Sequence, residues 1–175
     1  MIESESTFIQ ALHADAPSAE RADKLSLYGW LVGSWDMHVS AFSPDGKRHE
    51  AAGKIYAGWI LEGRALQDVW TIPRSGTDPF PVAGNWCGTT VRTYDPSIDA
   101  WQILWIDPAT NTFRKQIGRA QDGRIVQIGT TDGVPVSRWS FLDIQPRSFR
   151  WLGEGSTDGG VNWRLFVEIR ATRIE

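Results

Sequence analysis

From residue 34 onward the chain is a series of short alternating runs separated by turn sequences, and this feature limits the folds open to it more than any other. Asp-Gly occurs four times, each time between runs rich in β-branched and aromatic residues, and Asp95-Pro96 and Asp107-Pro108 supply two further turns. Such dipeptides are typical of the turns that join antiparallel strands. The pattern predicts about ten consecutive strands, at residues 34–43, 47–58, 64–72, 87–94, 100–107, 112–121, 124–131, 134–143, 148–157 and 161–173.

A meander of this many strands favours a closed barrel, because closure removes exposed edge strands. We therefore predict an all-β fold, a single antiparallel up-and-down β-barrel of about ten strands. Apolar residues at helical spacing in 18–30 predict one short helix near the N-terminus that plugs one end of the barrel. The barrel domain is assigned to 18–175 and a flexible acidic tail to 1–17, and the Gly- and Pro-rich residues 73–86 are expected to form a loop.

Composition excludes several classes of protein. With 41% hydrophobic and 22% charged residues the chain is not disordered, and no apolar run approaches the roughly 18 residues of a membrane span. Residues 1–23 hold five acids and one arginine, which leaves a nearly neutral body with 16 acids and 17 bases and makes nucleic acid an unsuitable partner. The absence of a visible secretory leader and the single cysteine, Cys87, together predict a cytoplasmic protein.

The first hairpin can be given a register from the sequence. Ser43-Pro44-Asp45-Gly46-Lys47 fits a three-residue loop with proline and glycine at the favoured positions. This loop pairs Trp35 with Ile55, Met37 with Gly53 and Val39 with Ala51. The turn at Asp122-Gly123 permits two registers, and the sequence does not decide between them.

In the last hairpin, a three-residue loop at residues 158–160 would pair Trp151 with Val167. The same register sets Arg150 opposite Glu168, and Glu154 opposite Arg164, on the other face. The two hairpins together predict an interior built from Trp35, Met37, Val39, Trp151, Leu165, Val167 and Ile169.

Trp35 and Arg173 are predicted to form a structural latch. Trp35 lies in Gly33-Ser34-Trp35 at the start of the first strand, and Arg173 has the inward parity of the last strand. The first and last strands are neighbours in a closed barrel, so the guanidinium can lie across the indole. There it can also donate to the backbone carbonyls of residues 29–32, which lack partners at a helix C-terminus.

This combination of a short helix, Gly-x-Trp and a late arginine resembles the calycin superfamily of lipocalins and fatty-acid-binding proteins. Three longer motifs resemble an uncharacterised bacterial lipocalin-like family within it, over about residues 25–173. These motifs are Leu31-Val32-Gly33-Ser34-Trp35-Asp36, Tyr94-Asp95-Pro96 with Trp101-x-x-x-Trp105-x-Asp107, and Ser156-x-Asp158-Gly159-Gly160-x-x-Trp163. They consist of turns and aromatic residues, so the resemblance implies the fold and assigns no catalytic residue.

Ten tryptophans spread along the chain indicate anchors from many elements, some filling a core and some lining a cavity. The leading prediction is therefore the binding of a small apolar or aromatic molecule inside the barrel. The candidate ligand contacts are Met37, Arg64, Trp101, Trp105, Trp139, Trp151 and Val167. Arg64 shares a strand face with Asp68, and this face either meets water or offers a polar group to a carboxylate- or phenol-bearing ligand.

Two alternatives stay open. An enzyme of the isomerase, cyclase or hydrolase type would need a buried, unpartnered titratable group facing the cavity. The sequence offers as candidates Glu50, Tyr56, Asp68 and Tyr94. An interaction module, for instance a homodimer, would instead expose aromatic residues such as Trp59, Phe80 and Trp86.

No metal or cofactor is predicted. His13 lies in the tail, and His38 and His49 have opposite parity on paired strands, so they cannot share one ion. Cys87 stands alone. No histidine follows residue 49, so an iron ligand from the C-terminal half, as in haem-binding relatives such as nitrobindin, has no candidate.

Overall fold

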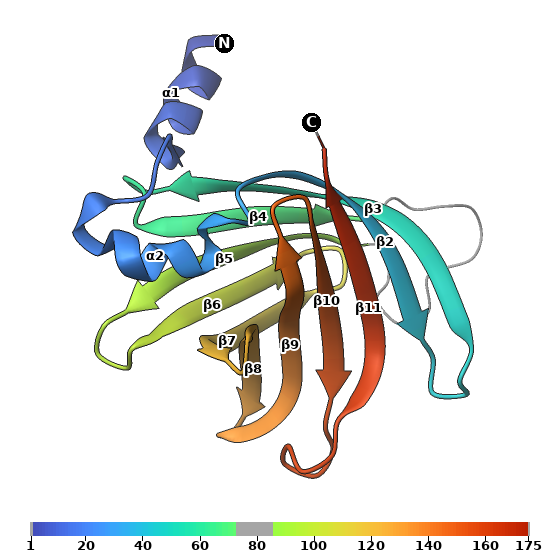
Figure 1. Cartoon of the computed structure of the whole chain (residues 1–175). Coiled ribbons are helices and arrows are strands. Elements are labelled where there is room, and N and C mark those ends of the chain that lie inside the picture. The colour runs from blue at the N-terminus through green and yellow to red at the C-terminus, as the bar shows by residue number, and fades with distance from the viewer. Residues whose placement is uncertain (1, 73–85, 175) are drawn as a thin grey trace.

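The computed structural model describes residues 2–72 and 86–174, and it shows a closed β-barrel with a helix at one end (Figure 1). The helices are α1 (Ile2–Leu12), the 3-10 turn η1 (Ala19–Arg21) and α2 (Ala22–Gly29). The strands are β1 (His13–Ala14), β2 (Gly33–Phe42), β3 (Arg48–Ile60), β4 (Ala65–Thr71), β5 (Cys87–Asp95), β6 (Ala100–Asp107), β7 (Thr112–Gln121), β8 (Arg124–Thr131), β9 (Val134–Gln145), β10 (Ser148–Gly155) and β11 (Arg164–Arg173).

Strands β2 to β11 pair in sequence order, all antiparallel, and β11 pairs with β2 to close the ring. The predicted up-and-down barrel is therefore confirmed, with ten strands in the part of the chain that the structure describes. Residues 73–85 of the predicted loop lie outside the described residues. Among the described helices, none is long and apolar enough to cross a membrane.

The segment assigned to an acidic tail contains α1, which projects from the barrel in Figure 1, and β1, which pairs with the end of β3. The division of the chain into a tail and a barrel domain stays a prediction. The predicted plug corresponds to η1 and α2, and α2 carries Leu25 and Tyr28 into the barrel, where both are buried.

The first hairpin has the predicted register, with Trp35 opposite Ile55 and Met37 opposite Gly53. The turn at Asp122-Gly123 is a two-residue loop that pairs Gln121 with Arg124. Asp122 and Gly123 both have positive φ, 50° and 75°, which is the backbone of a type I′ turn and matches the twist of the strands it joins.

The predicted register of the last hairpin is wrong. Trp151 pairs with Ile169 rather than with Val167. The connection spans residues 156–163, because the Asp158 carboxylate accepts hydrogen bonds from the backbone and side-chain N–H groups of Asn162, at 2.9 and 2.7 Å. These bonds close a loop wider than three residues.

A β-bulge in the same hairpin corrects one predicted interior residue. The register shifts between Gly153 and Glu154 and leaves Phe166 as the extra residue of β11. Leu165, opposite Glu154, is therefore turned to the outer face and is only half-buried, whereas Phe166 packs edge-on against Trp139 at 5.1 Å. The other predicted interior residues are buried.

Of the two ion pairs predicted for the outer face of this hairpin, one is present and the other is not. Arg150 contacts Glu168 at 3.2 Å. Glu154 pairs with Arg138 of β9 at 2.7 Å and not with Arg164, because β9 sets Arg138 directly opposite it.

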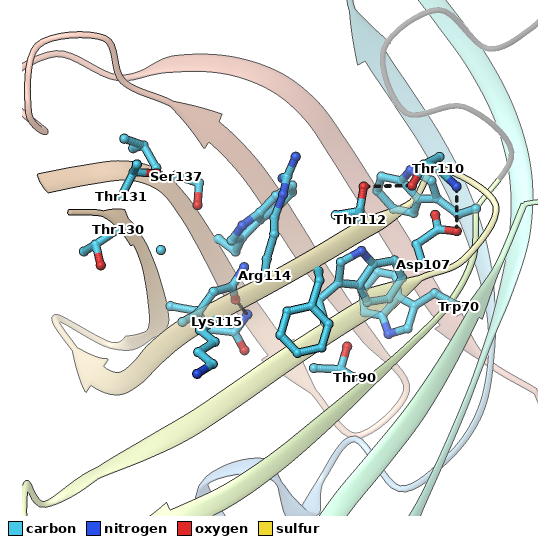
Figure 2. A pocket seen from close by; sticks show the side chains of 18 of the residues that line it. Trp70, Thr90, Asp107, Thr110, Thr112, Arg114, Lys115, Thr130, Thr131 and Ser137 are labelled. Atoms are coloured by element: carbon cyan, nitrogen blue, oxygen red, sulfur yellow. Dashed lines mark hydrogen bonds between the residues drawn. The ribbon is translucent and has the colours of Figure 1, made fainter. Parts of the chain in front are cut away.

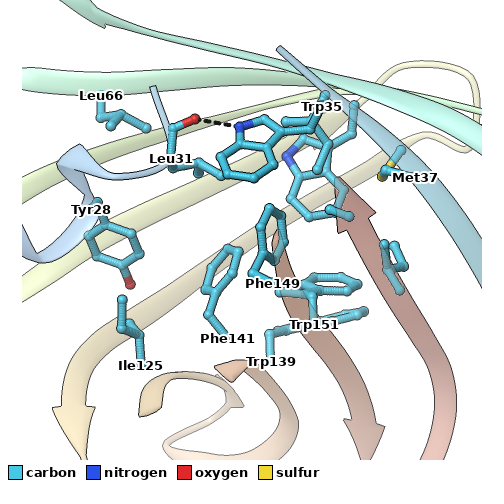
Figure 3. Close-up of a cluster of buried hydrophobic side chains, with 14 of the residues drawn as sticks. Tyr28, Leu31, Trp35, Met37, Leu66, Ile125, Trp139, Phe141, Phe149 and Trp151 are labelled. Carbon is cyan, nitrogen blue, oxygen red and sulfur yellow. Dashed lines mark hydrogen bonds between the residues drawn. The ribbon is translucent and has the colours of Figure 1, made fainter. Parts of the chain in front are cut away.

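Aromatic side chains fill the helix end of the barrel (Figure 3). The Tyr28 ring meets Trp101 edge-on at 4.8 Å and Phe141 at 6.2 Å. Trp35 and Phe149 continue the same edge-to-face packing at 4.9 Å. The interior of the barrel at this end is therefore filled by side chains.

Arg173 covers Trp35 at the seam between β11 and β2. Its guanidinium carbon lies 4.1 Å from the centre of the indole, and its Nη atoms donate to the carbonyls of Val32 and Trp30, each at 2.7 Å. A third N–H group donates to the carbonyl of Pro146 at 2.9 Å. One side chain thus joins the seam, the residues after α2 and the β9–β10 turn.

We expect Arg173→Ala to lower the free energy of unfolding by about 1–3 kcal/mol, because three carbonyls lose a donor and the Trp35 face loses its cover. Arg173→Lys should not restore the loss, since an ammonium neither stacks flat nor spreads its donors. Chemical denaturation measures both variants. The matched control is Arg170→Ala: Arg170 is exposed and contacts Glu168, and an equal or larger loss there would contradict the latch.

Asp158 makes the stability of the last hairpin sensitive to acid. The hydrogen bonds from Asn162 and Ser156 lower the pKa of Asp158 from 3.8 to about 2. The carboxylate therefore stabilises the fold fully above pH 4, and this contribution is lost as the pH falls toward 2. We expect the difference in unfolding free energy between the wild type and Asp158→Ala to shrink over this interval. A difference that stays constant from pH 5 to pH 2 would contradict the assignment.

Candidate functional site

A cavity of about 860 Å³ occupies the end of the barrel away from α2 (Figure 2). Ligand pockets of drug-sized molecules have volumes of this order, roughly 300–1,000 Å³. The described residues that line it are Trp70, Trp86, Thr90, Arg92, Trp105, Asp107, Thr110, Thr112, Phe113, Arg114, Lys115, Gln116, Gln127, Gly129, Thr130, Thr131, Val136, Ser137, Trp139, Trp151 and Phe166.

Indole rings from several strands form a continuous wall along this cavity. Trp139 and Trp151 are stacked with their centres 4.6 Å apart, and Trp70 lies 4.9 Å from Trp151. Trp86 lies 6.1 Å from Trp151 and 6.2 Å from Trp105. Five tryptophans from four strands and the residue before β5 thus contribute to one surface, within the described part of the chain.

Two glycines allow the wall to lie close to the sheet. A Cβ atom on Gly153 would overlap the ring of Trp139, and a Cβ on Gly88 would overlap the ring of Trp105. Each indole therefore extends over the backbone of a neighbouring strand instead of standing upright into the cavity. The position of both rings depends on residues that do not line the cavity.

The floor of the cavity is polar. Arg92 and Asp68, 1% and 0% exposed, form an ion pair inside the barrel. Gln127 accepts a hydrogen bond from the Tyr28 hydroxyl at 3.1 Å and donates one to Gln116 at 3.3 Å. Burial raises the pKa of Tyr28 well above its ordinary value, so this phenol stays a donor. A connected polar layer separates the aromatic plug from the open space.

The cavity opens sideways between β7 and β8. These strands pair only over residues 116–121 and 124–129. Beyond this stretch, residues 112–115 and 130–131 have no pairing with each other, and both groups line the cavity. Figure 2 shows β7 and β8 on the two sides of this opening. It offers a route from solvent to the indole wall.

The charged side chains that line the cavity, among the described residues, are Arg92, Arg114, Lys115 and Asp107. Arg114 and Lys115 are exposed on β7 beside the opening. Asp107 is buried, and its carboxylate accepts a hydrogen bond from the backbone N–H of Ala109 at 2.9 Å. Cationic groups therefore outnumber carboxylates in this lining.

The residues predicted to contact a ligand separate into three groups. Trp105, Trp139 and Trp151 line the cavity. The structure places Met37, Trp101 and Val167 in the buried core, outside the cavity lining. Trp101 shares a face of β6 with Trp105, but it lies at the helix end against Tyr28.

Arg64 lies outside the cavity. It precedes β4 in the β3–β4 turn and contacts Glu20 at 2.9 Å and Glu62 at 2.6 Å. Asp68, on the same strand face, is buried and paired with Arg92 rather than exposed to water. Strand parity placed Arg64 and Asp68 on one face, but Arg64 lies in the turn and Asp68 in the barrel interior, because the strand begins only at Ala65.

Of the described residues named for the alternative functions, Trp86 alone lines the cavity. The titratable candidates Glu50, Tyr56, Asp68 and Tyr94 do not line the cavity. Of the aromatic residues named for a dimer surface, Trp59 is buried and Trp86 lines the cavity, while Phe80 lies outside the described residues. Within the described ranges, no group of three His, Cys, Asp or Glu side chains could hold a metal ion.

Sequence reasoning missed the residues of the floor and the opening. Arg92 lies on the same face of β5 as Gly88 and Thr90, and this face points into the barrel. Strand parity therefore assigns Arg92 to the interior and could have identified it as the partner of Asp68. Trp86 was considered only as an exposed residue. Arg114 carries no signal, because its place in the cavity depends on where β7 and β8 separate.

Solved structures of other proteins share this architecture. The S-type phycobiliprotein lyase CPES from Guillardia theta aligns with a TM-score of 0.59 and 12% identity, covering 91% of this chain and 99% of that one. The fold is lipocalin-like. Rv2717c from M. tuberculosis aligns with a TM-score of 0.55 and 10% identity, over 87% and 98%. No family model and no curated protein sequence matches the chain. At these identities the likeness shows the fold alone, and membership of the uncharacterised bacterial family stays a prediction.

The buried ion pair gives a test of the cavity floor. We expect Arg92→Met to lower the free energy of unfolding by about 3–5 kcal/mol, because it leaves the Asp68 carboxylate buried without a counter-ion. The double variant Asp68→Leu with Arg92→Met should lose less than the single variant, since it removes both charges. Urea denaturation measures the two. A double variant that loses as much stability as Arg92→Met, or more, would contradict a coupled pair.

Proposed function

We propose that this protein binds a small apolar or aromatic molecule in the cavity at the open end of its barrel. The observation that carries the proposal is a space of about 860 Å³ with an indole wall and a polar floor. Closed barrels of this size class hold a single small ligand when side chains do not fill them. Flat aromatic walls favour flat or apolar guests, because burial of such surfaces against indoles removes apolar area from water.

The arrangement of the interior supports this proposal. Packing around Tyr28 and Trp35 supplies a core at the helix end, so the fold does not need the other end to be filled. The opening between β7 and β8 gives a ligand access without disruption of the barrel. The likeness to the phycobiliprotein lyase agrees with the proposal at the level of architecture.

The test is a fluorescence titration with N-phenylnaphthylamine, an uncharged aromatic probe that becomes bright in apolar sites. We expect saturable binding by the wild type. Ser137 lines the cavity on β9, and a larger side chain at this position would fill part of the cavity. We expect Ser137→Trp to weaken binding of the probe by about tenfold or more, since the indole would occupy the site.

The matched control is Ser148→Trp. Ser148 is exposed at the start of β10 and does not line the cavity, so the same substitution should leave binding unchanged there. No binding by the wild type, or equal binding by Ser137→Trp and the wild type, would contradict the proposed function.

A further inference from the structure

The indole wall contains three hydrogen-bond donors without partners. Trp70, Trp139 and Trp151 are 2%, 6% and 8% exposed, and the Nε1–H of each has no hydrogen-bond partner among the described residues. Buried polar groups in folded proteins are almost always paired, so a cluster of unpaired donors needs an explanation. All three belong to residues that line the cavity, although the nitrogen atoms themselves are buried from water.

The indoles outside the cavity provide a contrast. Trp35 donates to the carbonyl of Leu31 at 2.8 Å, and Trp30 donates to the carbonyl of Leu27 at 2.9 Å. Both lie at the helix end, where backbone acceptors are within reach. Unpaired indole N–H groups therefore coincide with the cavity and do not characterise the barrel interior as a whole.

The charges around the cavity favour the same kind of ligand group. Arg114 and Lys115 flank the opening, and neither forms an ion pair within the described residues. Arg92 is neutralised by Asp68, and the Asp107 carboxylate is engaged by the turn that follows it. Indole, guanidinium and ammonium groups donate hydrogen bonds and accept none. The lining thus supplies donors and positive charge, and among the described residues Asp107 is its one acidic side chain.

We infer that the natural ligand is an organic anion, with a flat apolar body against the indole wall and a carboxylate or similar acidic group that accepts hydrogen bonds from the Trp70, Trp139 and Trp151 N–H groups. This inference rests on the proposed function and specifies its ligand class. Arg114 and Lys115 attract the anion to the opening between β7 and β8, because opposite charges in a partly desolvated site raise both affinity and encounter rate.

The hydroxyl groups in the lining are compatible with this ligand class. Thr90, Thr130, Thr131 and Ser137 can each donate to an acidic group as well as accept from a neutral one. Thr110 and Thr112 satisfy each other through a hydrogen bond of 2.8 Å. A neutral polyol would also use these hydroxyls, but it would form no ion pair with the cations at the opening.

The experiment compares two probes that share one body. Anilinonaphthalenesulfonate is N-phenylnaphthylamine with an added sulfonate, so their affinities for the wild type isolate the effect of the negative group. We expect the sulfonated probe to bind about tenfold more tightly at low salt, as donors and cations meet the sulfonate. We also expect this preference to fall as sodium chloride is added, because the two cations at the opening are exposed.

Arg114→Gln then tests the opening, with Arg124→Gln as its matched control. Arg124 is an exposed arginine of β8 that does not line the cavity. We expect Arg114→Gln to weaken binding of the sulfonated probe about threefold more than it weakens binding of the neutral probe, whereas Arg124→Gln changes neither. Trp139→Phe, which keeps an aromatic ring and removes one donor, should likewise reduce the preference for the sulfonate.

The outcomes separate the two proposals. If neither probe binds the wild type, the proposed function and this inference both fail. If both bind with equal affinity, or the neutral probe binds more tightly, the cavity is a binding site and the inference of an anionic ligand is overturned. Equal losses of affinity for the two probes in Arg114→Gln would also count against it, because a change of structure affects both probes alike and a loss of charge affects chiefly the sulfonated one.

Discussion

The Asp68–Arg92 ion pair lies inside the barrel at the level where aromatic packing gives way to open space. Two opposite charges stay ionised away from water only when they pair with each other and when neighbouring groups supply further hydrogen bonds. Around Arg92 this is done by Asp68, by Gln127 and by the faces of the Tyr28 and Phe141 rings, 5.2 and 5.9 Å away. Apolar side chains packed directly onto this layer would leave its polar groups unpaired, so the layer keeps the space above it from being filled as an ordinary core.

The two ends of the barrel consequently have different roles. At the helix end, Tyr28, Trp35 and Arg173 join α2 and the closing strands through ring contacts and hydrogen bonds to backbone carbonyls. This end concentrates the interactions that stabilise the fold. At the other end, the strands β7 and β8 separate and the indoles keep their N–H groups free. The cavity, and with it the proposed binding site, thus lies where the structure can tolerate an unfilled interior.

Much of the fold could be predicted because alternation and turn chemistry are local. The Asp45-Gly46 turn and the inward parity of Trp35 together determine the first hairpin, and a change of register by one residue would reverse its faces. The last hairpin was not predictable in the same way. Its register depends on the Asp158 side chain and on a bulge at Gly153, and neither leaves a trace in the alternation.

The site was predictable only in part, for a related reason. Parity identifies which side chains point inward, such as Trp105, Trp139 and Trp151, and it does not tell at which height along the barrel each one lies. Trp101 and Trp105 have the same parity, yet one is part of the plug and the other faces the cavity. The height follows from the stagger of all ten strands, which is a property of the closed ring and not of any single strand.

Gly88 and Gly153 give the cavity a means of evolutionary adjustment. Each underlies an indole and has no side chain of its own, so the first methyl group added there would tilt a ring of the wall. The shape of the cavity is therefore encoded partly in positions outside its lining. A change at either of these two backbone positions would alter that shape while every lining residue stays the same.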